Sequence, residues 1–513
     1  MTSTTAIVQG RNPRTGEPVG AGVPETGPDE LEAQLAAAAA AFEVTRRTTP
    51  DERAHLLRTI ADRLQEAADD LVPLAAAESG LPLPRLTGEV ARTANQLRLF
   101  AEVISEGSYL EAILEDADPN TIPPRPVLRR WLEPMGPVLV FAASNFPFAF
   151  SVLGGDTASA LAAGAPVVVK AHGSHPALSR AVGDIAAAAV AEAGFPAGTF
   201  GLILGDQQGV QALRDRRITA SGFTGSTSGG RFLFDVASSR PDPIPFYGEL
   251  GSVNPTVVTP EAVAARGVEI AAGYAGSFTL GAGQFCTKPG LLFLPAGHGL
   301  DAALRAAVEQ VVAAPLLNAR IAGQLEADVA ELSQRADVEN VGLGGAVPPD
   351  GIGGFWTSAR LYRTSATAIA ADPDGLTGEH FGPVSLIVEY GDEAELFAAL
   401  AAVPGSLTAT VHAEPADSFP VDRLVSYLAT RAGRVIYNGW PTGVAVAWAM
   451  QHGGPWPSST SVAHTSVGAT AIRRWLRPVS YQDLPDELLP AALQAANPWG
   501  LPRREPAAGP AAD

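Results

Sequence analysis

The chain of 513 residues contains a single cysteine, Cys286, and this scarcity excludes an intrachain disulfide. The fold therefore does not depend on an oxidising compartment. Basic residues are outnumbered as well, because 35 Lys and Arg stand against 54 Asp and Glu, for a net charge of −19. Such an acidic surface repels phosphate backbones and anionic lipid, so neither nucleic acid nor a membrane is expected as a partner.

Long hydrophobic runs are also missing. No stretch of about 18 uncharged apolar residues suits a membrane span, and the N-terminus MTSTTAIVQG lacks the basic start and apolar segment of a secretory signal. The eight histidines are scattered, so no metal site is expected. Serine hydrolase (GxSxG) and Walker A motifs are absent too. These absences leave a cytoplasmic enzyme as the expectation.

Two patterns divide the chain. Residues 28–115 have the spacing of amphipathic helices, with a capping box of Thr49 and Glu52 at one helix start and Gly80 at its end. From residue 137, short apolar runs such as APVVVKAH alternate with helical segments. Continuous apolar runs are typical of parallel strands that are buried on both faces. The second part is therefore expected to contain a parallel sheet covered by helices.

Another α/β pattern begins near residue 247, so the expected fold class is α/β, with a doubly wound dinucleotide-binding domain and an α/β catalytic domain. Two segments that carry RRWL fit neither core and are expected to pair as strands of an oligomerisation arm. The last residues, EPAAGPAAD, have the composition of a disordered tail. The predicted units are the dinucleotide-binding domain (1–124 and 137–247), the catalytic domain (248–455), the arm (125–136 and 456–490) and a partly disordered tail (491–513).

Cys286 lies in the segment GAGQFC, where Gly281 and Gly283 would let the backbone approach a ligand closely. One interpretation is a small buried hydrophobic residue, which is what most free cysteines are. The alternative is a nucleophile whose thiolate is favoured by a nearby dipole or base. The glycine-rich surroundings favour the nucleophile.

Glu249 and Asn145 are its candidate partners. The segment FYGEL surrounds Glu249 with apolar residues, so desolvation is expected to raise its pKa and suit it to general-base catalysis. The alternative is an ordinary surface carboxylate. Asn145 follows an expected strand, at the carboxyl end where open α/β sheets build their sites. Its amide is expected to donate to an oxyanion, unless it only forms an Asx turn.

Three segments indicate a dinucleotide site. GFTGSTSGGRFL leads from a strand into a helix whose N-terminus suits a pyrophosphate, although it is not a GxGxxG fingerprint. VVVKAH ends a strand with a lysine that can reach a ribose or phosphate, or is simply solvated. GEHFGP offers a carboxylate for ribose hydroxyls and an aromatic ring to pack on a flat one. The candidate residues are Gly225, Ser226, Gly230, Lys170, Glu379 and Phe381.

In order and spacing, these motifs resemble the aldehyde dehydrogenase family. The similarity extends from NPRTGEPV near residue 12 to YQDLP at residue 485. The residues that carry it are, in chain order, Asn145, Lys170, Gly225 to Gly230, Glu249, Cys286 and Glu379 to Pro383. The resemblance implies that Cys286 attacks an aldehyde, that Asn145 and the Cys286 N–H hold the oxyanion, and that Glu249 activates water to release the acid from a thioester. It also implies a homodimer or homotetramer joined through the arm.

The resemblance further implies NAD or NADP as cofactor. Family members that prefer NAD often have an acidic residue three positions after the strand-end lysine, where this chain has Gly173. No carboxylate there would repel a 2′-phosphate, and His172, Ser174 or His175 could approach it. NADP is therefore expected to be accepted and preferred.

Within the family, segments such as LRPVSYQDLP resemble bacterial α-ketoglutaric semialdehyde (2,5-dioxovalerate) dehydrogenases. That substrate carries a carboxylate, which a cationic or amide-rich pocket would bind. Family geometry puts the helix of ANQLRLF beside the substrate tunnel. The expected substrate residues are Asn95, Gln96 and Arg98, with Phe148 and Phe285 along the aliphatic part of the tunnel. The alternative for Arg98 is a plain surface charge.

Three other functions compete with this one. The chain also resembles NADP-linked fatty aldehyde dehydrogenases, which take longer apolar substrates. A cysteine-dependent esterase would need only Cys286, Asn145 and Glu249. A non-catalytic protein that keeps the fold is the third, but such proteins usually lose the cysteine or the glutamate, and both are present here. The segment NGWPTGVAVAWAMQHGGPWPSST, residues 438–460, belongs to the subgroup, and its role does not follow from one sequence.

Overall fold

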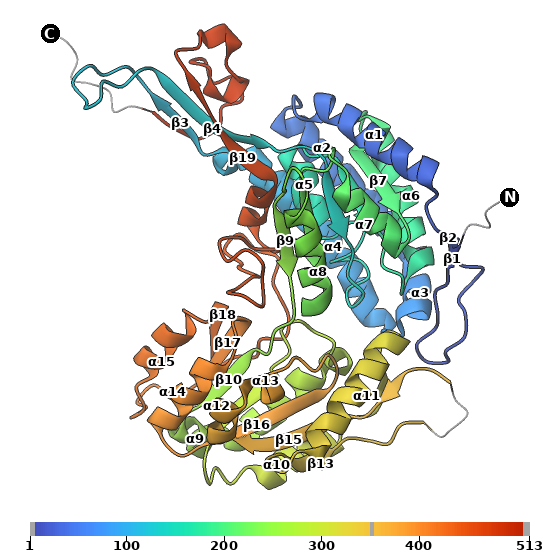
Figure 1. The fold of residues 1–513 in the computed structure, drawn as a ribbon, viewed down its shortest axis with the longest axis vertical. Coiled ribbons are helices and arrows are strands. Elements are labelled where there is room, and N and C mark those ends of the chain that lie inside the picture. The colour runs from blue at the N-terminus through green and yellow to red at the C-terminus, as the bar shows by residue number, and fades with distance from the viewer. Residues whose placement is uncertain (1–5, 349–352, 506–513) are drawn as a thin grey trace.

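The computed structural model describes residues 6–348 and 353–505 (Figure 1). Four helices follow the N-terminal hairpin of β1 (Ile7–Val8) and β2 (Val23–Pro24): α1 (Pro28–Thr45), α2 (Pro50–Glu66), α3 (Ala68–Ser79) and α4 (Leu83–Glu106). The Thr49 capping box is confirmed, because its hydroxyl accepts from Glu52 N at 3.2 Å and its backbone N–H donates to the Glu52 carboxylate at 2.7 Å. The helix expected to end at Gly80 is in fact two, because the chain leaves helical geometry at Ala67.

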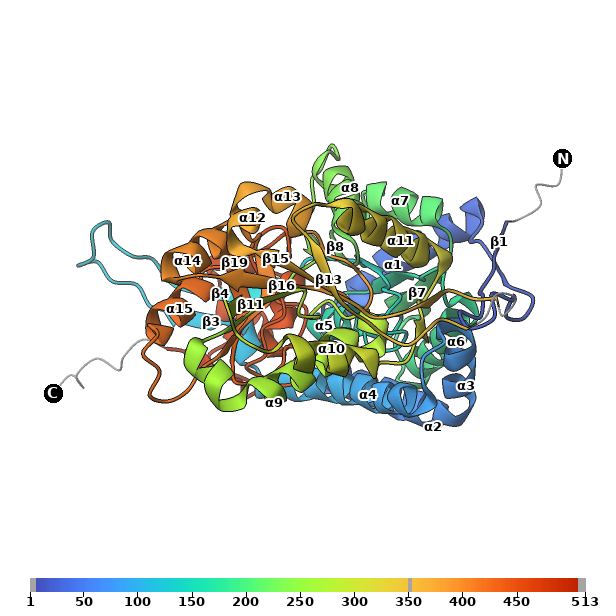
Figure 2. The same cartoon turned by 90° about the horizontal axis from the view of Figure 1, so that it is seen from below.

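The first large sheet has five parallel strands in the order β7 (Phe200–Ile203), β6 (Val167–Lys170), β5 (Val138–Phe141), β8 (Ala220–Thr224) and β9 (Phe246–Glu249). Helices α2 to α4, α5 (Gly155–Ala163) and α6 (Pro176–Glu192) cover one face, and α1, α7 (Asp206–Arg214) and α8 (Thr227–Ser238) cover the other (Figure 2). This is the doubly wound arrangement that the apolar runs predict. The strand β9, which ends at Glu249, was not predicted.

The second large sheet has seven strands, in the order β13 (Glu339–Leu343), β15 (Arg360–Ser365), β16 (Val384–Tyr390), β11 (Leu291–Pro295), β10 (Pro255–Val258), β17 (Ser406–His412) and β18 (Ala432–Tyr437). All neighbours are parallel except β13 and β15. The helices packed around it are α9 (Pro260–Thr279), α10 (Asp301–Glu309), α11 (Ala319–Gln334), α12 (Ala366–Ala371), α13 (Pro373–Leu376), α14 (Glu393–Ala402) and α15 (Val421–Leu428). Figure 1 shows this lobe below the first.

A third sheet projects from the body as an arm (Figure 1), in the order β19 (Leu476–Gln482), β4 (Leu128–Pro134), β3 (Ala112–Glu115) and β20 (Arg503–Arg504). The expected pairing of the two RRWL segments is confirmed, since β19 and β4 are antiparallel neighbours. Most of the second RRWL is a 3-10 helix instead of a strand, because Trp475 turns inward and donates to Ser159 Oγ at 2.8 Å. Both β3 and β20 lie outside the ranges predicted for the arm.

Two further expectations from composition concern the C-terminal tail and membrane-spanning helices. Of the predicted tail, residues 506–513 lie outside the described residues, whereas 491–505 contain a 3-10 turn and β20. Within the described ranges, no helix has both the length and the apolar character needed to cross a bilayer.

Candidate active site

The loop that carries Cys286 is shaped by left-handed backbone at Gly281, Ala282 and Gly283, with φ of 59°, 56° and 68°. A β-carbon at Gly283 would lie 2.1 Å from Gly382 O. Glycine is therefore needed so that this loop can pack against residues 380–384, and the expectation that it approaches a ligand is wrong at Gly283. Asn254 holds the other side of the loop by donating to Cys286 O at 2.8 Å.

Lys288 ties the same loop to the segment GEHFGP. Its buried ammonium donates to Gly382 O at 3.1 Å and Val384 O at 2.8 Å. Burial lowers the pKa of Lys288 to about 8. Burial also raises the pKa of Glu379 to about 7, and the positive charge of Lys288 opposes that rise. The cysteine and the carboxylate expected to bind ribose therefore lie on two loops that one cation joins.

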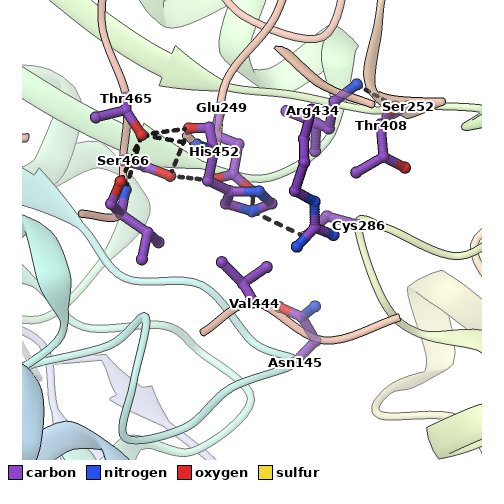
Figure 3. Close-up of polar contacts among 12 residues, drawn as sticks. Asn145, Glu249, Ser252, Cys286, Thr408, Arg434, Val444, His452, Thr465 and Ser466 are labelled. Atoms are coloured by element: carbon purple, nitrogen blue, oxygen red, sulfur yellow. Dashed lines mark hydrogen bonds and ion pairs between the residues drawn. The ribbon is translucent and has the colours of Figure 1, made fainter. Parts of the chain in front are cut away.

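The centre of the site is a chain of three side chains (Figure 3). His452 Nε2 lies 2.9 Å from Glu249 Oε1 and 3.4 Å from Cys286 Sγ. His452 and Glu249 are buried, and Cys286 is half-buried. The predicted proximity of Cys286 and Glu249 is thus realised, and His452 adds a third group that contacts both. Both contacts involve the same ring nitrogen, so Nε2 can take the thiol proton and then donate to the Glu249 carboxylate, whereas Nδ1 has no partner among the described residues.

The electrostatics of this chain differ from the expectation for Glu249. Burial raises the pKa of the Cys286 thiol well above its usual range, and the negative charge of Glu249 raises it further. Burial acts in the same direction on Glu249, but His452, Ser466 and Cys286 hydrogen bonds outweigh it and lower the pKa of that carboxyl. The expectation of a Glu249 with raised pKa is wrong because its partners were not visible in the sequence.

His452 was missed because it lies in the segment 438–460, to which no role was assigned. The loop is held by paired contacts: His452 N donates to Thr465 Oγ1 at 2.7 Å, and Ser466 N donates to His452 O at 2.8 Å. The Ser466 hydroxyl donates to Glu249 Oε2. The one available signal was a histidine beside two glycines, of which Gly454 packs so closely that a β-carbon would lie 2.3 Å from Ser406 O.

Asn145 lies on the loop after β5 and lines the same cavity as Cys286 and Glu249. Its Nδ2 donates to Gln284 O at 3.0 Å, which fixes the amide beside the cysteine loop. The amide nitrogen carries two hydrogens, so one is left to donate to an oxyanion. The role expected for Asn145 stays a prediction with a suitable placement.

A cavity of about 550 Å³ extends from Cys286 along the carboxyl ends of the first sheet. Six of the predicted cofactor residues line it: Lys170, His172, Gly225, Ser226, Glu379 and Phe381. The Ser226 hydroxyl caps α8 by accepting from Gly229 N at 3.3 Å, so the helix N-terminus opens into this cavity. A strand-end lysine, a helix N-terminus and a carboxylate around one elongated space fit a dinucleotide.

Three predicted cofactor residues do not line the cavity. Gly230 lies inside α8, where a β-carbon would meet Leu250 at 2.0 Å, so it serves helix packing. Ser174 Oγ accepts from Asn318 Nδ2 at 2.9 Å, and Gly173 is exposed outside the cavity lining. The sequence motifs located these residues along the chain, but they did not show which of them line the cavity.

The structure adds a carboxylate to the cofactor cavity. Lys170 Nζ forms an ion pair with Asp206, the first residue of α7, and Asp206 is itself part of the lining. His172 is neutral there, because burial and the neighbouring His175 and Lys170 hold its pKa well below the usual range. Arg320 of α11 lines the opposite wall. Gly173 brings no negative charge to the cofactor cavity, but Asp206 of α7 does.

The residues predicted to bind substrate are mostly turned away. Arg98 donates to Asp62 Oδ1 at 2.6 Å, and Asn95 is exposed, so the structure does not support either as a substrate ligand. Gln96 is buried against Gly155. Phe148 is packed in the core, and its backbone N–H donates to Glu89 Oε1 at 2.9 Å. The helix α4 does lie beside the site, but the residues predicted to bind substrate are not those on its side toward the site.

The face of α4 toward the site carries Arg85, Glu89 and Arg92, at spacings of four and three residues. The Arg85 guanidinium lies 4.9 Å from the ring centroid of Phe285, and that of Arg92 lies 5.2 Å from that of Phe150. Phe285, a predicted tunnel residue, therefore lies in this aromatic and cationic cluster.

Arg92 and Arg434 lie within the electrostatic reach of Cys286. Burial lowers the pKa of both guanidinium groups. The charge of Glu89 opposes that effect on Arg92, and a Cys286 thiolate would oppose it on both. Figure 3 shows Arg434, from β18, extending toward Cys286. Among the described residues, Arg92 Nη1 and Arg434 Nε are buried donors without a hydrogen-bond partner. Unused buried donors are costly, which favours an anionic ligand for them.

The aldehyde dehydrogenase family model matches residues 1–478. The chain belongs to the aldehyde dehydrogenase family. The α-ketoglutaric semialdehyde dehydrogenase 2 of Azospirillum brasilense is 45% identical over 501 residues, covering 96% of this chain and 94% of that protein. The α-ketoglutaric semialdehyde dehydrogenase of Acinetobacter baylyi is 41% identical over 479 residues, covering 93% and 90%. An NADP-dependent enzyme of Escherichia coli has a similar crystal structure, with a TM-score of 0.78, 25% identity and coverage of 93% and 94%.

Family membership confirms the α/β fold and the enzyme class expected from the motifs. This aldehyde dehydrogenase is an oxidoreductase that oxidises aldehydes and uses NAD or NADP. The esterase, non-catalytic and fatty-aldehyde alternatives are not favoured by these relatives. The cavity next to Cys286 fits the cofactor that the family uses.

Proposed function

We propose that this aldehyde dehydrogenase oxidises α-ketoglutaric semialdehyde to 2-oxoglutarate. The two relatives that span nearly the whole chain carry that activity in their names. The observation that carries the proposal is the pair Arg92 and Arg434, each of which has a buried guanidinium nitrogen without a hydrogen-bond partner and a charge that acts on Cys286. The substrate has a carboxylate at the end opposite its aldehyde, and arginine is the side chain best suited to bind it.

In the first step, Cys286 Sγ bonds to the aldehyde carbon while His452 Nε2 accepts the thiol proton. The imidazolium that results is stabilised by Glu249 at 2.9 Å. The electrons of the carbonyl bond move onto oxygen, where the free hydrogen of Asn145 Nδ2 and the Cys286 N–H donate to the oxyanion. The thiol has a raised pKa at rest, so this coupled proton transfer is what makes the sulfur a nucleophile.

A bound NAD or NADP would supply the oxidant that converts the adduct on Cys286 to a thioester. Lys170, the α8 N-terminus, Glu379 and Phe381 are the residues that would hold the cofactor. Glu249 then accepts a proton from the water that attacks the thioester carbon. The carbon–sulfur bond breaks, the acid leaves, and Cys286 recovers its proton from the His452 imidazolium.

The predicted preference for NADP stays a prediction, and Asp206 modifies it. Its carboxylate lies on Lys170, where a ribose hydroxyl or a 2′-phosphate of the cofactor would compete for the same ammonium. A carboxylate accepts from hydroxyl groups and repels phosphate. We infer that Asp206 limits the preference for NADP that Gly173 alone would allow.

The predicted homodimer or homotetramer also stays a proposal. The arm sheet extends away from both lobes and ends in the strand β19 at one edge, with unpaired backbone groups on its outer side. Such an edge is suited to pairing with a second copy. Light scattering of the purified enzyme would give the oligomeric state, and a monomer would contradict the proposal.

Initial rates of reduced cofactor formation test the substrate. We expect kcat/KM for α-ketoglutaric semialdehyde to exceed that for propanal and for a long-chain aldehyde. An Arg92→Gln enzyme should lose this preference while keeping its rate with propanal. Equal kcat/KM for the acidic and neutral aldehydes in the wild type would contradict the proposed substrate.

A further inference from the structure

Three potential metal ligands converge at the reactive sulfur, although the sequence indicated no metal site. Glu249 and Cys286 lie 37 positions apart, and His452 is another 166 positions along the chain. One ligand atom from each lies within 4.8 Å of the other two. We propose that these three residues form an exchangeable Zn²⁺ site, which inhibits the enzyme by binding the sulfur that must attack the aldehyde.

The separations of the ligand atoms suit zinc. Bonds of about 2.3 Å to sulfur and about 2.0–2.2 Å to nitrogen and oxygen place tetrahedral ligand atoms roughly 3.3–3.6 Å apart. His452 Nε2 lies 3.4 Å from Cys286 Sγ and 2.9 Å from Glu249 Oε1. The nitrogen therefore faces both other ligands, and a small side-chain adjustment admits the ion in place of the proton between them.

Access and charge also favour the ion. Cys286 and Glu249 both line the 550 Å³ cavity, so a hydrated cation has a path to them. A thiolate and a carboxylate together balance the two charges of Zn²⁺, and a neutral imidazole completes a three-ligand set with the fourth position open to the cavity. Arg92 and Arg434 are the cations whose charges reach Cys286, and they oppose the ion.

The surroundings favour an ion that exchanges. Zinc-bound imidazoles usually donate their other N–H to a carboxylate or carbonyl, which strengthens binding. His452 Nδ1 has no such partner in the part of the chain that the structure describes. Glu249 and Cys286 are better supported, by the Ser466 hydroxyl and by Asn254. On binding, the thiol releases its proton to the solvent and no atom is oxidised or reduced.

The lone cysteine makes the test direct. Cd²⁺, a spectroscopic substitute for Zn²⁺, gives an ultraviolet charge-transfer band when a thiolate binds it, and in this chain that band can only arise from Cys286. Titration of the purified full-length enzyme with Cd²⁺ should produce the band at one ion per chain, and Zn²⁺ should displace it. Zn²⁺ should also inhibit oxidation of propanal, with recovery after EDTA, so the result does not depend on the proposed substrate.

Variants distinguish this site from a simple thiol adduct. Cys286→Ser should abolish the band, and His452→Gln and Glu249→Gln should each weaken Cd²⁺ binding by about tenfold or more. His55→Gln, which removes an exposed histidine of α2, should leave the titration unchanged. Far-ultraviolet circular dichroism verifies that each variant is folded. Absence of the band in the wild type, or a band that neither His452→Gln nor Glu249→Gln weakens, would overturn the proposal.

Discussion

The two sides of Cys286 are built in different ways. On the cofactor side, Lys170 ends β6, Ser226 caps α8, and Glu379 precedes β16, so each residue stands next to a strand or helix end in the sequence. On the substrate side, Arg92 comes from the middle of α4 and His452 from a long loop. Strand ends of a parallel sheet meet at one edge by construction. A helix face or a loop has no such rule, and this difference explains which residues were predictable.

The two sides also differ in what they offer a ligand. The cofactor cavity combines Lys170 with two carboxylates, Asp206 and Glu379. On the substrate side, the guanidinium groups of Arg85 and Arg92 pack on aromatic rings. Arg85 Nη1, Arg92 Nη1 and Arg434 Nε are buried donors without a hydrogen-bond partner among the described residues. Substitutions on one side should therefore leave ligand binding on the other nearly unchanged.

Replacing the sulfur should have the largest effect. Cys286→Ala removes the atom that forms the thioester, so turnover should fall by at least about 10³-fold. NADP binding, measured by calorimetry, should change little, because the cofactor contacts remain. Turnover close to that of the wild type would show that another group is the nucleophile.

His452→Gln should be next in size. The amide cannot accept the thiol proton, and proton transfer by a positioned base typically contributes about 10²–10⁴ in rate. We expect kcat to fall within that range while the Kd of NADP stays the same. His55→Gln serves as the control. A kcat reduced less than about threefold would mean that Glu249 acts on Cys286 without the imidazole.

Arg92→Gln should raise KM for the acidic substrate. Hydrogen bonds to charged groups contribute about 1.5–3 kcal/mol, which corresponds to roughly 10–100-fold. Propanal oxidation should be nearly unaffected, since propanal has no carboxylate. Arg98→Gln on the same helix is the matched control, because Arg98 is directed at Asp62. A similar rise of KM in the Arg98→Gln enzyme would show that Arg98 binds the substrate, as the sequence predicted.

Asp206→Ser should give the smallest change, confined to the cofactor side. Removal of this exposed carboxylate releases Lys170 and should shift the ratio of kcat/KM for NADP over NAD upward by about fivefold, on the order of 1 kcal/mol. The KM for the aldehyde should be constant. A shift toward NAD would show that Asp206 does not act against the 2′-phosphate.

How much of the fold and of the site could be predicted depends on the same difference between strand ends and helix faces or loops. The parallel strands were predictable because continuous apolar runs such as β6 are buried on both faces. The short edge strands β9 and β20 carry no such run and were missed. In the site, Lys170 and Glu379 were found from local motifs. Arg98 was chosen on α4 and Arg92 was missed, because the sequence does not fix which side of the helix faces the site, and the two residues lie roughly 120° apart around it.

By itself, the sequence determined that one sulfur, Cys286, is the nucleophile candidate, and it predicted a dinucleotide site along the ends of a parallel sheet. Both conclusions depend on local patterns, since loop and strand-end motifs are encoded by neighbouring residues. The tertiary structure alone decided that His452 joins Cys286 to Glu249, across 166 positions of chain. It also decided that the charges of Arg92 and Arg434 lie within reach of the sulfur. Packing of the loop 438–460 and the rotation of α4 set these contacts, and neither leaves a periodic signal in the sequence.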